Sequence, residues 1–179
     1  MASKHFIPIL LLILLPTIIT ANPETSHSEK TPNTPKEPTI IIEGMVMCQS
    51  CKQAAGSWSL AEAKPLPSAK VSISCKDHKN RVKHYQVVKT DLGGYFYSPL
   101  HGLDINNYKF YLGHPIHACS VRLVSSADMG CNVLTNINGG IEGGKLRDEK
   151  KKKLVSGAVV YSAGPLAFRP AHCLPPVHY

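Results

Sequence analysis

Six cysteines constrain the fold of this chain more than any other feature of its sequence. They are Cys48, Cys51, Cys75, Cys119, Cys131 and Cys173. All of them follow residues 1–21, where a positively charged start precedes a short apolar stretch that is interrupted by prolines and ends in small residues. This pattern is typical of a secretory signal peptide. Because exported proteins meet an oxidising environment, an even number of cysteines indicates three disulfides, with the pairing left open.

A zinc site is the main alternative use of these cysteines. Cys48 and Cys51 are separated by two residues, and His114, His117 and Cys119 supply further zinc-type ligands. However, no second Cys-x-x-Cys motif or suitably spaced histidine pair accompanies them, and export favours oxidation. A redox role is weaker still, because no β-α-β pattern surrounds the motif. We therefore predict disulfides, with no metal and no other cofactor.

The chain divides into the signal peptide, a linker and one domain. Residues 22–39 contain four prolines among serines, threonines and charged residues, a composition that predicts a Pro-rich disordered linker. Residues 40–179 are long enough for one ordinary domain. No apolar run reaches the ~18 residues that a membrane-spanning helix needs, so no membrane span is expected.

Short segments of alternating apolar and polar residues predict β-strands throughout the domain. The clearest segment is 71–76, where Val71, Ile73 and Cys75 alternate with polar residues. Similar segments lie at 40–48, 85–89, 95–97, 119–123 and 158–162. Helical periodicity is nearly absent, and residues 54–63 form at most a turn or two. The sequence predicts an all-β domain, a disulfide-stapled antiparallel β-barrel or sandwich of about seven strands.

The alternation also places individual side chains. Cys75 and Cys119 fall on inward faces beside aliphatic neighbours, so a bridge between them would cross the core of two packed sheets. Tyr95 and Tyr97 share one strand face while Phe96 points to the other. One side of this strand is therefore expected in the core, and the other is expected to be exposed or to face a ligand.

No arrangement of catalytic residues stands out. The acidic residues are few and scattered, and Asp91 lies in a turn signal, where a hydrogen bond from the backbone to its carboxylate is the simplest explanation. No Gly-x-Ser-x-Gly motif is present, and no cysteine is left as a nucleophile if all six pair. We therefore predict that the protein is not an enzyme and has no catalytic residues.

Basic residues give the strongest binding signal. The formal net charge is +8, and two basic runs occupy residues 76–84 and 147–153. Lysine and arginine suit the repeated carboxylates of a polyanion, because many weak contacts add by avidity. The candidate polysaccharide-binding residues are Lys79, Arg81, Lys83, Arg147, Lys150, Lys151, Lys152 and Lys153. An ordinary solvated surface is the alternative, and nucleic acid is not expected as a partner of an exported protein.

Aromatic and histidine side chains offer a second kind of contact. Exposed rings could stack on sugars, and several histidines would gain charge near pH ~5–6 and strengthen binding to a polyanion. The candidate rings are Trp58, Tyr85, Tyr95, Tyr97, Tyr108 and Tyr111. Packing into the core is the commoner role for such residues, and His114, which precedes Pro115, is expected to be structural.

Six motifs stand out when the domain is taken as a whole. They are residues 43–51 (EGMVMCQSC), 69–77 (AKVSISCKD), 90–96 (TDLGGYF), 114–123 (HPIHACSVRL), 131–140 (CNVLTNINGG) and 163–170 (AGPLAFRP). Together with the cysteine layout, they resemble the plant pollen Ole e I allergen and extensin family. Within that family, residues 40–173 are most similar to the cysteine-rich domain of non-classical arabinogalactan proteins and proline-rich cell-wall proteins.

The resemblance implies a disulfide pairing, a location and a kind of ligand. Laid on this sequence, the family's disulfides would join Cys48 to Cys131, Cys51 to Cys173 and Cys75 to Cys119. Relatives are extracellular, and some bind pectic or galactan polysaccharides and other wall glycoproteins. The chain departs from the family in its linker, which is much shorter than the Pro- or His-rich region of arabinogalactan relatives.

Two expectations for function follow. The first is a secreted, non-enzymatic plant cell-wall protein whose basic β domain binds pectic, galactan or arabinogalactan polysaccharide and contributes to wall structure or development. The second is an extracellular protein-binding module, a ligand or cofactor for a receptor or another wall glycoprotein. Binding that weakens with salt would favour the first, and binding through an apolar or aromatic patch would favour the second.

Overall fold

A computed structural model describes residues 39–104, 108–153 and 158–173. The chain divides into two units, residues 1–34 and 35–179, and every described residue lies in the second unit. The expected signal peptide lies outside the described residues, as does the expected linker up to residue 38. The first strand begins at Thr39, which the sequence assigns to the last position of the linker.

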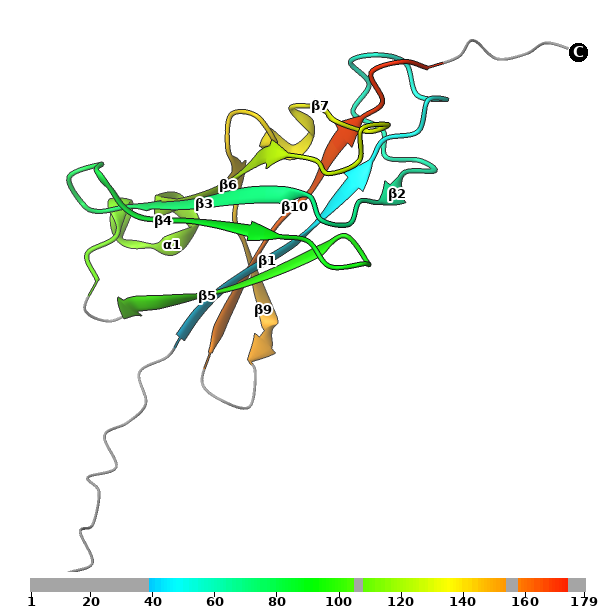
Figure 1. Ribbon diagram of the computed structural model, residues 1–179. Coiled ribbons are helices and arrows are strands. Elements are labelled where there is room, and N and C mark those ends of the chain that lie inside the picture. The colour runs from blue at the N-terminus through cyan, green and yellow to red at the C-terminus, as the bar shows by residue number, and fades with distance from the viewer. Residues whose placement is uncertain (1–38, 105–107, 154–157, 174–179) are drawn as a thin grey trace, which may run out of the picture. The chain divides into compact units, whose positions relative to one another are not determined.

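The described residues form two β-sheets (Figure 1). Sheet A contains β1 (Thr39–Cys48), β2 (Lys64–Pro65), β5 (Tyr95–Asp104), β7 (Val133–Leu134), β9 (Arg147–Lys153) and β10 (Val159–Arg169). Sheet B contains β3 (Lys70–Lys76), β4 (Val82–Lys89), β6 (Cys119–Ser125) and β8 (Gly144–Lys145). The predicted all-β class is confirmed, and the sheets stay separate instead of closing into one barrel.

The order of the strands puts the first and last long strands side by side. Sheet A runs β2-β1-β10-β7, with β5 also paired to β1 and β9 to β10, and sheet B runs β4-β3-β6-β8. The β1–β10 pair is parallel, whereas the sequence predicts antiparallel strands throughout. The difference arises because the chain passes through the whole of sheet B before it returns beside β1, a long connection that suits parallel pairing.

The last strand is also longer than predicted. The sequence predicts a strand over residues 158–162, but β10 continues through Gly164 and Pro165 to Arg169. The continuation is possible because the register with β1 shifts between Gly44 and Val46. Gly44 itself is required there, since a Cβ atom would lie 2.3 Å from the Ala163 carbonyl oxygen.

The inward faces of both sheets form one apolar core. Sheet A contributes Ile40, Ile42, Val46, Phe96, Leu166 and Phe168, and sheet B contributes Val71, Ile73, Cys75, Cys119 and Val121. Phe96 is 1% exposed while Tyr97 is 48% exposed, so the predicted two-sided character of this strand is confirmed. Alternation at every second residue is what lets short strands bury one face only.

The three disulfides join the same cysteines that the family resemblance implies. They are Cys48–Cys131, Cys51–Cys173 and Cys75–Cys119. Cys75 and Cys119 are buried as expected, but they face each other on the neighbouring strands β3 and β6. This bridge therefore links two strands of one sheet, and the expectation that it crosses between sheets is wrong.

Helical structure is limited to short segments among the described residues. These are η1 (Tyr111–Gly113), α1 (Pro115–Ala118) and η2 (Ile137–Gly139). His114 caps α1, because its Nδ1 atom accepts a 3.3 Å hydrogen bond from the Ile116 N–H. Its ring also meets Tyr161 edge-on, with centroids 5.7 Å apart. The expected structural role of His114 is confirmed.

Candidate functional site

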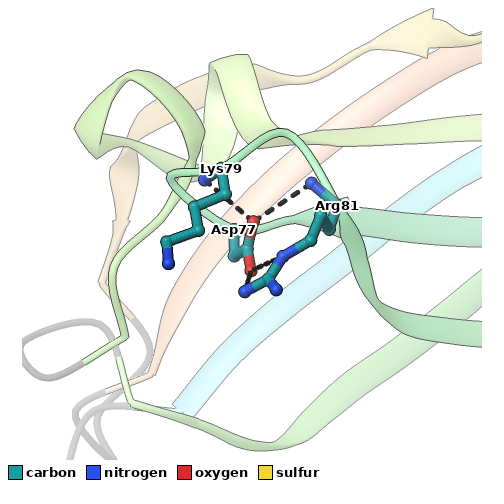
Figure 2. Close-up of polar contacts among 3 residues, drawn as sticks. All are labelled: Asp77, Lys79 and Arg81. Atoms are coloured by element: carbon teal, nitrogen blue, oxygen red, sulfur yellow. Dashed lines mark hydrogen bonds and ion pairs between the residues drawn. The ribbon is translucent and has the colours of Figure 1, made fainter.

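The first basic run forms the end of β3, a tight turn and the start of β4. Asp77 organises this turn (Figure 2). Its Oδ1 atom accepts hydrogen bonds from the Lys79 N–H at 2.9 Å and the Arg81 N–H at 3.0 Å. Figure 2 shows the Lys79 side chain directed away from this carboxylate, so only the backbone of Lys79 takes part.

Arg81 is held by the same carboxylate. Its Nε and Nη2 atoms donate to Asp77 Oδ2 at 3.0 and 2.7 Å, the paired geometry that suits arginine and a carboxylate. The hydrogen bonds from the Arg81 guanidinium lower the pKa of Asp77 from 3.8 to about 2, against the opposing effect of burial. Arg81 therefore has a structural role in the turn, whatever part it takes in binding.

A pocket of about 460 Å³ opens beside this turn. Its walls come from the turn, from β4, from the end of β5 and from the segment that precedes η1. The lining residues are Asp77, His78, Lys83, His84, His101, Gly102, Leu103, Tyr108 and Lys109, and we call it the histidine–lysine pocket. Two backbone contacts hold its walls together: the His78 N–H donates to the Lys109 carbonyl at 2.9 Å, and Asp77 forms a β-bridge with Phe110.

Two buried polar atoms in this pocket have no hydrogen-bond partner among the described residues. They are His84 Nε2 and the Tyr108 hydroxyl. His84 lies opposite Cys75 in the β3–β4 pair, on the inward side of the sheet. Burial lowers the pKa of His84 against a hydrogen bond with Gln86, and burial together with the Asp77 charge raises the pKa of Tyr108. Because unsatisfied buried polar atoms are costly, a ligand with acceptor atoms fits this pocket.

The second basic run lies in the other sheet. Arg147 begins β9, and its guanidinium donates to the Gly164 carbonyl. It lines a pocket of about 200 Å³ together with Glu43 and Tyr95, whose hydroxyl donates to the Glu43 carboxylate. Burial, followed by the Glu43 hydrogen bond, raises the pKa of Tyr95. The other predicted binding residues of this run are Lys150, Lys151, Lys152 and Lys153, whose side chains the structure does not describe.

The structure therefore divides the predicted binding residues instead of gathering them. Lys83 lines the histidine–lysine pocket, Lys79 and Arg81 lie on the adjacent turn, and Arg147 belongs to a different pocket. Sequence reasoning treated the histidines as scattered and did not place His84 beside Tyr108. The signal for this pairing is weak in the sequence, because the two residues meet only through the packing of β4 against the segment that follows β5.

The cysteines considered for a zinc site are all engaged in disulfides. Cys48, Cys51 and Cys119 are bonded to other cysteines, and His114 caps a helix. Within the described part of the chain, no group of three or more His, Cys, Asp or Glu side chains has the arrangement of a metal site. In the same residues, no helix has the length and apolar character required to cross a membrane.

Comparison with known proteins gives relatives in plants. Non-classical arabinogalactan protein 30 of Arabidopsis thaliana is 32% identical over 137 residues, which cover 73% of this chain and 53% of that protein. Pistil-specific extensin-like protein of Nicotiana tabacum is 32% identical over 145 residues, which cover 75% of this chain and 31% of that protein. The chain thus spans about half the length of the first relative and about a third of the second.

A solved structure shares the fold. The crystal structure of the major plantain pollen allergen Pla l 1 matches with a TM-score of 0.53 at 22% sequence identity, covering 76% of this chain and 98% of that chain. At this identity the likeness concerns the fold alone. No protein-family model matches the chain.

Proposed function

We propose that this chain, which resembles the pollen Ole e I allergen and extensin family in sequence and in fold, is a secreted, non-enzymatic plant cell-wall protein. Its basic β domain binds acidic wall polysaccharide of the pectic or arabinogalactan type and so contributes to wall structure or development. The names of the relatives, arabinogalactan and extensin-like proteins, support the wall assignment. The polysaccharide assignment rests on the histidine–lysine pocket.

The observation that carries the proposal is the pair of unsatisfied polar atoms in this pocket. His84 Nε2 and the Tyr108 hydroxyl are buried without a partner among the described residues. A carboxylate offers two oxygens that accept hydrogen bonds, and it satisfies both atoms at once. Lys83 and Lys109 line the same pocket and supply positive charge for an anionic ligand. The pocket thus suits the carboxylate of a uronic acid residue better than a neutral sugar.

A polymer would extend this single contact along the neighbouring surface. Lys79, on the turn beside the pocket, carries an exposed side chain. Repeated carboxylates of one chain then engage several weak cationic sites in turn, and the contacts add by avidity. Such binding weakens as salt screens the charges.

The proposed ligand also makes binding depend on pH. A bound carboxylate favours the protonated form of His84, whose pKa is lowered by burial in the free protein. Binding therefore takes up a proton and strengthens as the pH falls. His78, His101, Lys83, Lys109, Tyr108 and Asp77 also line the pocket, so the contribution of His84 has to be isolated by substitution.

The test is retention of the oxidised protein on immobilised pectin, at low and high salt and at about pH 5.5 and 7.5. The double variant Lys83→Gln, Lys109→Gln is expected to lose most of the salt-sensitive retention. The matched control is Lys70→Gln, Lys89→Gln, which removes the same charge from two exposed lysines that pair at the other end of the β3–β4 hairpin. Equal losses of retention in both double variants would show that retention depends on net charge alone, which would contradict the pocket assignment.

The variant His84→Gln tests the pH dependence separately. Glutamine keeps a hydrogen-bonding side chain but cannot titrate, so the gain in retention between neutral and mildly acidic pH should shrink. An unchanged pH profile would show that the remaining groups of the pocket account for it.

A protein-binding role is the second candidate, and the outer face of β4 favours it. This strand lies at the edge of sheet B, and Tyr85 and Val87 are 65% and 44% exposed on it. An exposed aromatic and apolar pair at a sheet edge is typical of a surface that receives another protein. Capture of a wall glycoprotein that survives high salt and is lost in Tyr85→Ser would favour this role over polysaccharide binding.

A further inference from the structure

A third pocket lies at the opposite end of the strands from the histidine–lysine pocket. It is built by the long loop between β1 and β2, by the segment from β7 to η2 and by the end of β10. Figure 1 shows the loop after β1 and the β3–β4 turn at opposite ends of the domain. The pocket measures about 150 Å³, and its polar and aromatic lining residues are Gln49, Ser57, Trp58, Thr135, Asn136 and Arg169.

The loop that carries Trp58 is fixed in place. The buried Gln49 donates from Nε2 to the carbonyls of Ser57 and Ser59 at 3.0 and 2.9 Å. The loop begins between two disulfide-bonded cysteines, Cys48 and Cys51. Despite this fixation, Trp58 is 67% exposed. Most of this large amphipathic ring is therefore open to a partner.

Several polar groups around Trp58 keep free hydrogen-bond donors, whereas Gln49 and Thr135 donate to backbone carbonyls. Asn136 Oδ1 accepts from the Ile141 and Glu142 N–H groups at 3.2 and 3.1 Å, which leaves its Nδ2 amide hydrogens. Ser57 Oγ accepts from the Ser59 N–H at 3.1 Å. The Arg169 guanidinium has no hydrogen bond or ion pair to any described residue, and the same holds for the Trp58 indole N–H.

These free donors define the chemistry of the missing partner. The Arg169 guanidinium and the Asn136 amide line the pocket together with the Trp58 ring, so a ligand needs acceptor atoms and a flat apolar side. Arginine favours a carboxylate, which it binds through two parallel hydrogen bonds. The pocket volume of about 150 Å³ suits one ring-sized group.

We infer that this pocket binds a single acidic sugar residue, a hexuronate. Its ring stacks on Trp58, and its carboxylate pairs with Arg169 while Asn136 donates to a ring substituent. The inference goes beyond the proposed function, because it concerns another site and a single sugar unit. It can therefore fail while the histidine–lysine pocket still binds pectin, and the reverse also holds.

Trp58 is the only tryptophan in the chain, so intrinsic fluorescence reports on this pocket directly. The oxidised protein is titrated with the methyl glycoside of galacturonic acid, with the matching neutral galactoside and with acetate. A saturable change in emission is expected with the uronate, at concentrations about tenfold lower than any change with the neutral sugar. Acetate, which lacks the ring, should produce no comparable change.

Two variants assign the roles of the side chains. Arg169→Gln should weaken uronate binding about tenfold or more. Asn136→Asp keeps the oxygen that accepts from Ile141 and Glu142 but places a negative charge in the pocket, so it should weaken uronate binding and spare the galactoside. Lys64→Gln is the control, because this exposed lysine ends the same loop without lining the pocket. Circular dichroism and the thermal midpoint of each variant show that the fold is retained.

Several outcomes would overturn the inference. Equal affinity for the neutral galactoside would show that the pocket does not recognise the carboxylate. Equal affinity for acetate would show that it does not recognise the sugar ring. Uronate binding that is unchanged in Arg169→Gln would place the ligand elsewhere, as would the absence of any response from Trp58. A folded Asn136→Asp variant that binds the uronate as tightly as the parent chain would contradict the donor arrangement.

Discussion

Two turns of this domain have the same hydrogen-bonding arrangement around an aspartate but lie in different surroundings. Asp77 follows β3 and Asp91 follows β4, and in each turn the carboxylate Oδ1 accepts from the backbone N–H groups two and four residues later. In each, the N–H of the third residue after the aspartate also donates to the aspartate carbonyl. That third residue is left-handed in both turns, Asn80 with φ 62° and Gly94 with φ 72°, as in three-residue hairpin loops.

The two turns differ in the residues that surround the aspartate. The Asp77 turn closes a hairpin within sheet B, and its second carboxylate oxygen binds Arg81. The Asp91 turn carries the chain from sheet B to sheet A, where a Cβ on Gly94 would meet the Val46 carbonyl oxygen at 2.6 Å. Local sequence therefore sets the hydrogen bonds within a turn, whereas the residues packed against the turn determine which of its positions is most sensitive to substitution.

The largest effect is expected at the crowded position of the Asp91 turn. Gly94→Ala forces a left-handed alanine into contact with two backbone atoms, Val46 O at 2.6 Å and Leu66 N at 2.9 Å. Left-handed strain and overpacking together should lower the free energy of unfolding by about 2–4 kcal/mol. Urea denaturation followed by circular dichroism measures this loss.

The neighbouring glycine supplies the control for that variant. A Cβ on Gly93 meets only the Asp91 Oδ1 atom, at 3.3 Å. Gly93→Ala should therefore change the unfolding free energy by about 0.5 kcal/mol or less. Similar losses of unfolding free energy in both variants would mean that the conformation of the turn, and not its packing between the sheets, determines the loss.

An intermediate effect is expected from removing the charge of Asp77, with removal of the Asp91 charge as the comparison. Asparagine keeps the oxygen that accepts the backbone N–H groups, so Asp91→Asn should leave the thermal midpoint almost unchanged. Asp77→Asn places an amide against the Arg81 guanidinium in a buried position and removes the ion pair, so its midpoint should fall by several degrees. Equal midpoints for the two variants would contradict a stabilising role for Arg81.

The same pair of variants predicts a difference in acid. The pKa of Asp77 is lowered from 3.8 to about 2, so its contribution to stability is present above pH ~4 and is lost as the pH falls toward ~2. The parent chain and Asp91→Asn should therefore lose more stability over this interval than Asp77→Asn. Thermal unfolding at closely spaced pH values measures the difference, and parallel curves for all three proteins would show that Asp77 titrates normally.

The smallest effect is expected at the left-handed residue of the Asp77 turn. Asn80 is exposed, and asparagine tolerates this conformation well. Asn80→Gly should change the unfolding free energy by a few tenths of a kcal/mol, because easier backbone geometry offsets the greater freedom of the unfolded chain. A loss comparable to that of Gly94→Ala would show that the Asn80 side chain has a role that its exposed position does not indicate.

The two turns also show how far sequence reasoning reached. The Asp91 turn was predicted because glycines follow it, and the alternation in residues 71–76 gave the correct strand and buried face. The Asp77 turn is indicated by the sequence only as a solvated hairpin within a run of charge, although Asp77 and Asn80 have the same spacing as Asp91 and Gly94. A predominantly basic run hides an ion pair within it, so the sequence presents Arg81 as a ligand for an external anion or as solvated surface, and not as the partner of Asp77.

Features that depend on distant segments were beyond prediction from local patterns. His84 and Tyr108 come from different strands and segments, and their shared pocket exists only once both sheets have packed. The exposed Trp58 was one ring among six candidates, and nothing in the surrounding residues indicated that Gln49 would hold its loop. Parallel pairing of β1 with β10 likewise follows from topology and not from the composition of either strand.

The parallel pairing of β1 with β10 constrains the order in which sheet A can form. Ile40 lies beside Val159 and Cys48 beside Phe168, so one edge of the first strand has its partner near the far end of the sequence. During synthesis from the N-terminus, β5 can pair with one edge of β1 once residue 104 has emerged, but the other edge stays unpaired until β10 follows. Such distant pairing slows folding and prolongs exposure to aggregation. Sheet A is therefore completed only when its last strand, β10, has emerged.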